Sequence, residues 1–103
     1  MTKYVLSYHG GGGMPETEAE MNELMEAWGS WFGSMGEAVV DGGNPFGPAK
    51  TITPDLAVSD EGQGLSGYSV ISAASIDDAV EMAKGCPVLA GGGTVCVNET
   101  IDM

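Results

Sequence analysis

The chain has 103 residues, of which 15 are acidic and 3 are basic, giving a formal net charge of −12 at pH 7. Such a charge repels phosphate backbones and anionic lipids, which argues against nucleic-acid and membrane partners. Because neither a run of roughly 20 apolar residues nor a signal-peptide core occurs, we expect a single cytoplasmic domain.

The first predicted elements are a strand and the start of a helix. Residues 4–9 alternate between two faces, as a strand does, and glycines at 10–13 follow it. These glycines lack the Gly-Lys-Ser/Thr ending of a phosphate-binding loop, so we interpret them as a flexible turn. Pro15 suits a first helical turn, and Thr17 with Glu20 has the pattern of a capping box.

The helix is predicted to end near residues 35–36, because its apolar residues recur every three or four positions up to that point. The apolar stripe consists of Met21, Leu24, Met25, Trp28, Phe32 and Met35. A stripe of this kind is typical of a helix laid on a sheet.

The middle of the chain is predicted to hold a short strand and an inserted hairpin. The strand covers residues 38–41 and stops at glycines and a proline. Residues 42–63 are rich in Gly, Pro, Asp and Ser, with β-prone pieces at 51–53 and 56–58. We expect these pieces to form a hairpin between two core strands, followed by a turn at 60–64.

The last third repeats the strand-and-helix pattern. A strand is predicted at residues 67–73, and Ser75 is the N-cap of a helix that runs to Lys84, with Gly85 as its C-cap. A connection through residues 89–93 leads to a final strand at 94–99.

This order predicts an α+β, ferredoxin-like βαββαβ fold with a four-stranded antiparallel sheet and both helices on one face. Strands 4–9 and 67–73 are expected at the centre, with strand 38–41 beside the latter. One sheet face would remain bare, so we expect two copies to stack these faces as a homodimer.

Several stretches together resemble the YCII-related family, a set of small proteins in the dimeric α/β-barrel group. They are KYVL at 3–6, AWGSW at 27–31, VVDGG at 39–43, GYSVI at 67–71 and DDAV at 77–80 with GCP at 85–87. The resemblance implies the fold and the dimeric state. Some related proteins are linked to removal of halide from chlorinated aromatic diols, with a histidine and an aspartate as the proposed catalytic pair.

This chain departs from that catalytic pattern. Those proteins carry a histidine on the first helix, whereas His9 is the only histidine here and Glu26 stands near the expected helix position. The catalytic roles therefore do not carry over residue by residue.

His9 and Asp41 are the candidate catalytic residues. His9 ends the first strand, and histidine alone has an unperturbed pKa close to neutrality. Asp41 ends the second strand before two glycines, a backbone suited to close ligand approach. Each also has a structural interpretation: His9 as a hydrogen-bonded strand end, and Asp41 as a residue that orients its own turn.

Ser7, Tyr68 and Asn98 are the candidate ligand-binding residues, because polar side chains on the strands could line a cavity between subunits. They could equally satisfy one another through buried water. The leading hypothesis is a small-molecule binding protein, or an acid–base enzyme of the lyase or dehydrochlorinase type that uses no cofactor. The alternative is a non-catalytic dimeric assembly or regulatory module.

Two further groups of residues have weaker signals. A metal site at Asp55, Asp60 and Glu61 is not expected, because calcium loops need a stricter alternation of oxygen ligands. Cys86 and Cys96 lack metal-ligand spacing, so we expect two buried thiols, with a disulfide left open.

Overall fold

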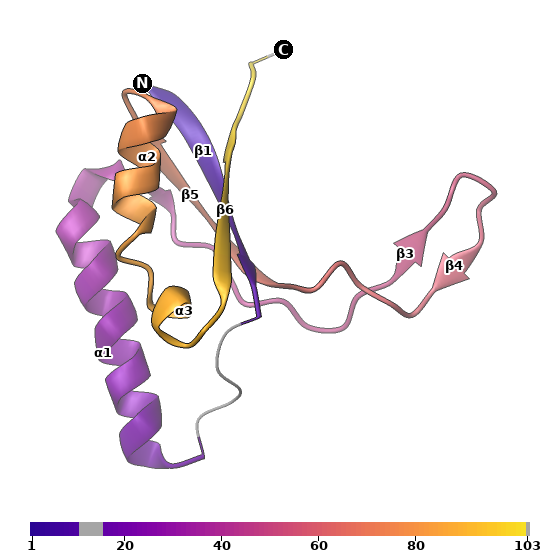
Figure 1. Cartoon of the computed structure of the whole chain (residues 1–103), viewed down its shortest axis with the longest axis horizontal. Helices are drawn as coiled ribbons and strands as arrows, with labels where there is room; N and C mark the ends of the chain where they lie inside the picture. The colour runs from indigo at the N-terminus through magenta and orange to yellow at the C-terminus, as the bar shows by residue number, and fades with distance from the viewer. Residues whose placement is uncertain (11–15, 103) are drawn as a thin grey trace.

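The computed structural model describes residues 1–10 and 16–102, which form an α+β fold around a four-stranded antiparallel sheet (Figure 1). The sheet order is β2-β5-β1-β6, with β1 (Thr2–His9) and β5 (Leu65–Ala73) in the centre. β2 (Val39–Asp41) and β6 (Thr94–Glu99) form the edges. The predicted α+β class and antiparallel sheet are confirmed.

The first helix begins with the predicted cap. α1 spans Glu18–Met35, and Thr17 Oγ1 accepts a hydrogen bond from Glu20 N at 3.1 Å. The return bond of the capping box reaches one residue further back, because Glu20 Oε2 accepts from Glu16 N at 3.0 Å. A 3-10 turn, η1 (Gly36–Ala38), follows the helix, so β2 starts one residue later than predicted.

The second helix also has the predicted N-cap. α2 spans Ile76–Ala83, and Ser75 Oγ accepts a backbone hydrogen bond at 3.2 Å. Its C-cap is Lys84 rather than the predicted Gly85. A one-turn helix, α3 (Pro87–Ala90), lies in the connection to the last strand and was not predicted.

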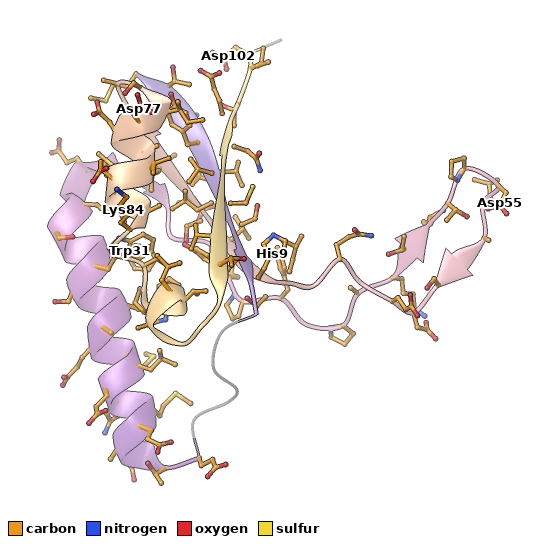
Figure 2. All side chains as sticks on the ribbon, viewed as in Figure 1. His9, Trp31, Asp55, Asp77, Lys84 and Asp102 are labelled. Atoms are coloured by element: carbon orange, nitrogen blue, oxygen red, sulfur yellow. The ribbon has the colours of Figure 1, made fainter. Side chains whose placement is uncertain are left out.

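The core lies between the helices and one face of the sheet. Its buried residues are Tyr4, Leu6, Tyr8, Trp31, Ile71, Ala73, Ala79, Ala83 and Cys86. Trp31 joins the two longer helices, because its indole N–H donates to Met82 O at 2.9 Å (Figure 2). A Cβ on Gly85 would lie 2.9 Å from the Trp31 ring. The glycine predicted as a C-cap therefore permits a close approach between helices instead.

Among the described residues, no helix lies over the other face of the sheet (Figure 1). We call this the uncovered face and define it by the strand side chains that point to it: Lys3, Val5, Ser7, His9, Tyr68, Val70, Ser72, Thr94, Cys96 and Asn98. They alternate along the strands with the core residues.

The predicted hairpin is confirmed, and it stands apart from the sheet. β3 (Thr51–Ile52) pairs with β4 (Val58–Ser59) in a separate two-stranded sheet. We call residues 46–64 the arm. The arm projects from the side of the sheet opposite the helices (Figure 1), and the radius of gyration is 15.1 Å. A compact chain of this length has a radius of gyration of about 13 Å, so the arm gives this chain an extended shape.

The remaining sequence predictions have mixed outcomes. Both cysteines are free, but Cys96 is exposed, which corrects the expectation of two buried thiols; it lies on edge strand β6, on the uncovered face. The predicted turn at 11–13 and the first-turn position of Pro15 lie outside the described residues. In the part of the chain that is described, no helix has the length and apolar character needed to cross a membrane.

Candidate functional site

A cleft of about 350 Å³ lies between α1 and the loop that follows β2. We call it the α1 cleft. Its side chains are mostly apolar and come mainly from α1, with contributions from α3 and the central strands: Tyr8, Leu24, Met25, Trp28, Phe32 and Val88. A concave, apolar surface of this size is typical of sites for small organic molecules.

Aromatic rings form one wall of the α1 cleft. Trp28 lies edge-on to Tyr8, with ring centroids 5.3 Å apart, and against Phe32 at 5.7 Å. Trp31, buried behind them, contacts both Trp28 and Phe32. Such mutually packed rings hold one another in place, so the wall is rigid and offers flat apolar surface.

The opposite wall is the loop that follows β2, and β5 holds this loop in place. Tyr68 N donates to Asn44 O at 3.4 Å, and Pro45 forms an isolated bridge with Gly67. Gly43 has φ +75°, and a Cβ there would lie 1.7 Å from Tyr68 O. Only glycine permits this contact between loop and strand.

A buried hydrogen-bond chain ties the same loop to the floor of the cleft. The Tyr8 hydroxyl donates to Ser69 Oγ at 2.6 Å, and Ser69 Oγ donates to Gly42 O at 2.7 Å. Burial raises the pKa of Tyr8 to about 12, so its hydroxyl is a fixed donor at neutral pH. Burial also raises the pKa of the Cys86 thiol, which lies against this hydroxyl. These groups position the loop and do not act as bases.

Two of the predicted site residues, Asp41 and Tyr68, meet on the uncovered face. Asp41 Oδ1 accepts a hydrogen bond from Gly43 N at 2.8 Å, the turn-orienting interaction. Its other oxygen, Oδ2, lies 3.5 Å from the Tyr68 hydroxyl, at the outer limit of hydrogen bonding. Tyr68 belongs to the strand at the edge of the cleft, but its side chain points to the uncovered face, where its ring stacks on Phe46 with centroids 5.7 Å apart. Asp41 and Tyr68 therefore place a carboxylate and a phenol on the uncovered face, outside the α1 cleft.

The other three predicted residues, Ser7, His9 and Asn98, lie on the uncovered face. Ser7 pairs with Tyr68 on one side and Cys96 on the other, whereas Asn98 pairs with Val5. None of these three lines the α1 cleft. His9 lies at the end of the sheet from which the arm departs (Figure 2).

His9 and Asp41 do not meet within one chain. Asp41 pairs with Val70, which pairs with Val5, four residues before His9 on β1. Two strand spacings and four residue rises separate them by roughly 16 Å. Direct proton transfer between His9 and Asp41 is therefore excluded within one chain.

The cleft was not predicted, because the apolar stripe of α1 was interpreted as the side of the helix that packs on the sheet. The stripe extends further than the sheet does: Trp31 is the one fully buried residue of α1, while Leu24 is 39% and Met25 67% exposed. The signal that could have revealed the cleft is this excess of apolar residues in the first half of the helix.

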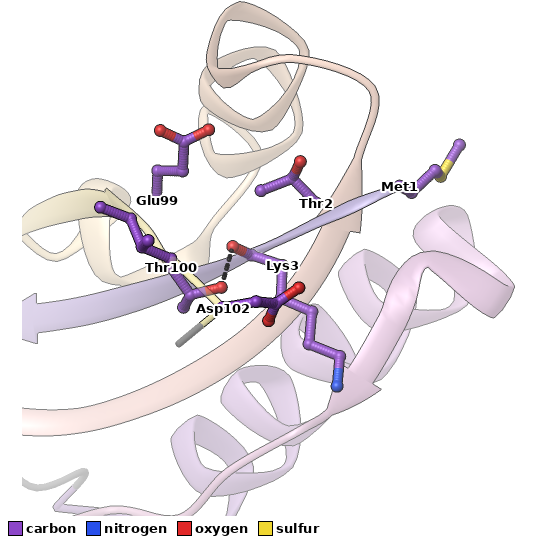
Figure 3. Close-up of a pocket in the computed structure, with 7 residues that line it drawn as sticks. Met1, Thr2, Lys3, Glu99, Thr100 and Asp102 are labelled. Atoms are coloured by element: carbon purple, nitrogen blue, oxygen red, sulfur yellow. Dashed lines mark hydrogen bonds between the residues drawn. The ribbon is translucent and has the colours of Figure 1, made fainter.

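A second hollow, of about 400 Å³, lies where the start of β1 meets the end of β6 (Figure 3). Thr100 closes the strand pair there, because its Oγ1 and its N both donate to Lys3 O, at 2.9 and 3.0 Å. Glu99 and Asp102 also line this hollow. The charged rim resembles a solvated surface more than an enclosing site.

The acidic residues considered for a metal site bind other groups. Asp60 accepts a hydrogen bond from Lys50 Nζ at 2.5 Å, and Asp55 accepts from Thr53 Oγ1 and from Ala57 N. Across residues 1–10 and 16–102, no three His, Cys, Asp or Glu side chains are grouped to hold a metal ion.

Comparisons with protein-family models, with curated proteins and with solved structures each return no significant match. The resemblance to the YCII-related family therefore rests on the sequence motifs alone, and the site is argued from its own geometry.

Proposed function

We propose that this protein binds a small, largely apolar molecule in the α1 cleft. The observation that carries the proposal is a cleft of about 350 Å³ whose wall is made of Trp28, Phe32 and Tyr8. Flat apolar rings of a ligand would pack on these side chains, while polar groups of the loop wall, which includes Asn44, would hydrogen-bond a hydroxyl group of the ligand. Phenols and small lactones have this combination of surfaces.

The proposal includes a homodimer of ferredoxin-like subunits, as the YCII-related resemblance implies. The order of the central strands supports this fold, and the charge of the uncovered face supports the pairing. None of the uncovered-face side chains of β1, β5 and β6 is acidic, although the chain has 15 acidic residues. The carboxylate of Asp41, on edge strand β2, lies at the margin of the face, 3.5 Å from the Tyr68 hydroxyl. Two copies can therefore stack the central part of these faces without bringing carboxylates together. The free thiols suit a reducing, cytoplasmic compartment.

The catalytic form of the proposal is acid–base chemistry without a cofactor, carried out on the uncovered face, where Asp41 lies beside Tyr68. Because His9 and Asp41 lie on different parts of one chain, this mechanism requires His9 of the partner subunit to approach Asp41 across the dimer. Asp41 would then orient the imidazole or share the proton transfer.

A ligand screen tests binding at the cleft directly. A panel of phenols and lactones is expected to raise the melting temperature of the wild-type protein as ligand exceeds its dissociation constant. Leu24→Trp, which fills the cleft, should abolish the shift. Asn22→Trp, on the opposite side of α1, is the matched control and should retain it. Equal shifts for both variants would place the ligand elsewhere.

Turnover of the same compounds tests the catalytic form. Any activity should be lost in His9→Ala while the thermal shift remains, because His9 does not line the cleft. Activity that survives in His9→Ala removes this residue from the mechanism.

The alternative is a non-catalytic assembly module, and the separation of His9 from Asp41 within one chain favours it. This alternative predicts that no polar aromatic ligand stabilises the protein, whereas the dimer persists.

A further inference from the structure

The arm is an amphipathic hairpin whose apolar side chains are exposed. Ile52 and Val58 lie opposite each other across its two strands, and they are 67% and 61% exposed. Leu56, near the tip, is 80% exposed. The neighbouring pair, Thr51 and Ser59, lies on the other face of the hairpin because successive strand residues alternate.

A hairpin of this size is not expected to hold its shape alone. Its two strands have two residues each, and isolated two-stranded hairpins are marginal in water. The Lys50–Asp60 salt bridge at its base is solvent-exposed, and exposed ion pairs add little stability. To keep its shape, the arm therefore needs a surface on which Ile52 and Val58 can pack.

The direction of the arm indicates where that surface lies. In Figure 1 the sheet is seen close to edge-on, with the helices on one side and the arm on the other, so that sheet and arm form the two limbs of an L. A second sheet stacked on the uncovered face would lie about 10 Å away, with its helices about 10 Å further out. Residues 46–55, when extended, reach roughly 30 Å. The arm is therefore long enough to pass the sheet of a second copy and reach its helical layer.

We propose that the arm of each copy clasps the side of a second copy stacked on the uncovered face. The occupant is a second copy because the arm and the uncovered face border the same corner of the molecule, and a two-fold axis gives both copies the same clasp. This inference rests on the proposed homodimer. In the dimer, the side chains of Ile52, Leu56 and Val58 of both arms are buried from water.

The test compares the dimer dissociation constants of two double variants by sedimentation. Ile52→Ser with Val58→Ser removes the apolar face of the arm and should raise the constant by about tenfold or more, since each substitution acts twice in a symmetric dimer. Thr51→Ser with Ser59→Thr exchanges the polar pair on the other face. This control should leave the constant within about twofold of wild type.

A second variant covers the case in which the serine substitutions only unfold the hairpin. Gly62 lies close to Ala49, so residues 49–62 can be replaced by two glycines without pulling on the sheet. This excision should weaken the dimer at least as much as the serine pair.

The outcomes separate the clasp from the dimer itself. A wild-type protein that stays monomeric at every concentration overturns both proposals. A wild-type dimer whose dissociation constant is unchanged by the serine pair, or by the excision, overturns the clasp and leaves the homodimer standing.

Discussion

At the scale of single residues, three polar atoms decide how the α1 cleft is built. Tyr8 and Ser69 are nearly or fully buried, at 4% and 0% exposure, and their hydroxyls would carry a desolvation cost if they were left unpaired. Pairing them in a chain that ends on Gly42 O removes that cost and anchors the loop opposite α1. The same atoms therefore serve the core and the cleft.

Tyr8→Phe should change how stability depends on pH. The pKa of Tyr8 is raised from its ordinary value of 10.0 to about 12 because burial disfavours the phenolate. Because the pKa is raised on folding, the contribution of the protonated Tyr8 hydroxyl to the free energy of unfolding is complete below about pH 10. It is lost as the pH rises from about 10 to about 12. The variant should lose about 1 kcal/mol at neutral pH, the usual value of one hydrogen bond, and decline less steeply at high pH.

Urea unfolding at neutral pH and across this alkaline window measures both effects. Tyr68→Phe retains Tyr8 and is the matched control, so its stability should fall with pH as that of the wild type does. Parallel curves for Tyr8→Phe and wild type would show that Tyr8 is not protected by burial.

Only some of these residue contacts could be predicted from the sequence. Asp41 and Tyr68 could be proposed as site residues from strand ends and glycines, and the structure brings them within 3.5 Å of each other. His9 could not be placed relative to Asp41, because strand register decides their separation and register follows from the whole sheet. The Tyr8–Ser69 bond joins residues 61 positions apart, and no local pattern reports such a contact.

At the scale of elements, the short edge strand β2 depends on its loop to stay on the sheet. β2 has three residues, but pairing with β5 continues through Asn44, Pro45 and Phe46. Gly43 is the point where the loop comes closest to β5, at a distance that leaves no room for a side chain.

Gly43→Ala should therefore destabilise the fold by about 2–4 kcal/mol, through backbone strain and displacement of the loop. It should also weaken ligand binding, since the same loop is a wall of the α1 cleft. Gly29→Ala is the control, because a Cβ there meets nothing within 4 Å and alanine favours a helix by about 1 kcal/mol. Urea unfolding of both variants checks the contrast. A Gly43→Ala protein within about 0.5 kcal/mol of wild type would contradict the contact.

Most elements followed from local chemistry. The caps at Thr17 and Ser75 and the limits of β6 match the predictions, because caps and strand alternation are properties of neighbouring residues. η1, α3 and the direction of the arm did not follow, since each depends on tertiary packing. Gly85 shows the same limit: its sequence position suggested a C-cap, whereas contact with Trp31 explains it.

At the scale of the whole molecule, charge and apolar surface are segregated. Ten of the 15 acidic residues lie on α1, α2 and the arm, while the uncovered-face side chains of β1, β5 and β6 include serine, threonine, valine and one lysine and no acid. The net charge of −12 could be read from composition. Its segregation from one sheet face required strand positions and register.

This segregation predicts that salt strengthens the proposed dimer. Two chains of charge −12 repel each other, and salt screens this repulsion wherever the charges are further apart than the Debye length. The apolar contact between the stacked faces is not screened by salt. Raising NaCl from about 0.02 M to about 0.5 M should lower the dissociation constant by about tenfold or more, because the Debye length falls below the separation of the acidic helices.

Sedimentation across this range measures how steeply the dissociation constant depends on salt. Glu23→Gln with Glu26→Gln removes two charges per chain from exposed positions of α1 and should flatten it. A dimer that weakens as salt rises would instead be held by ion pairs, which contradicts stacking through the uncovered face.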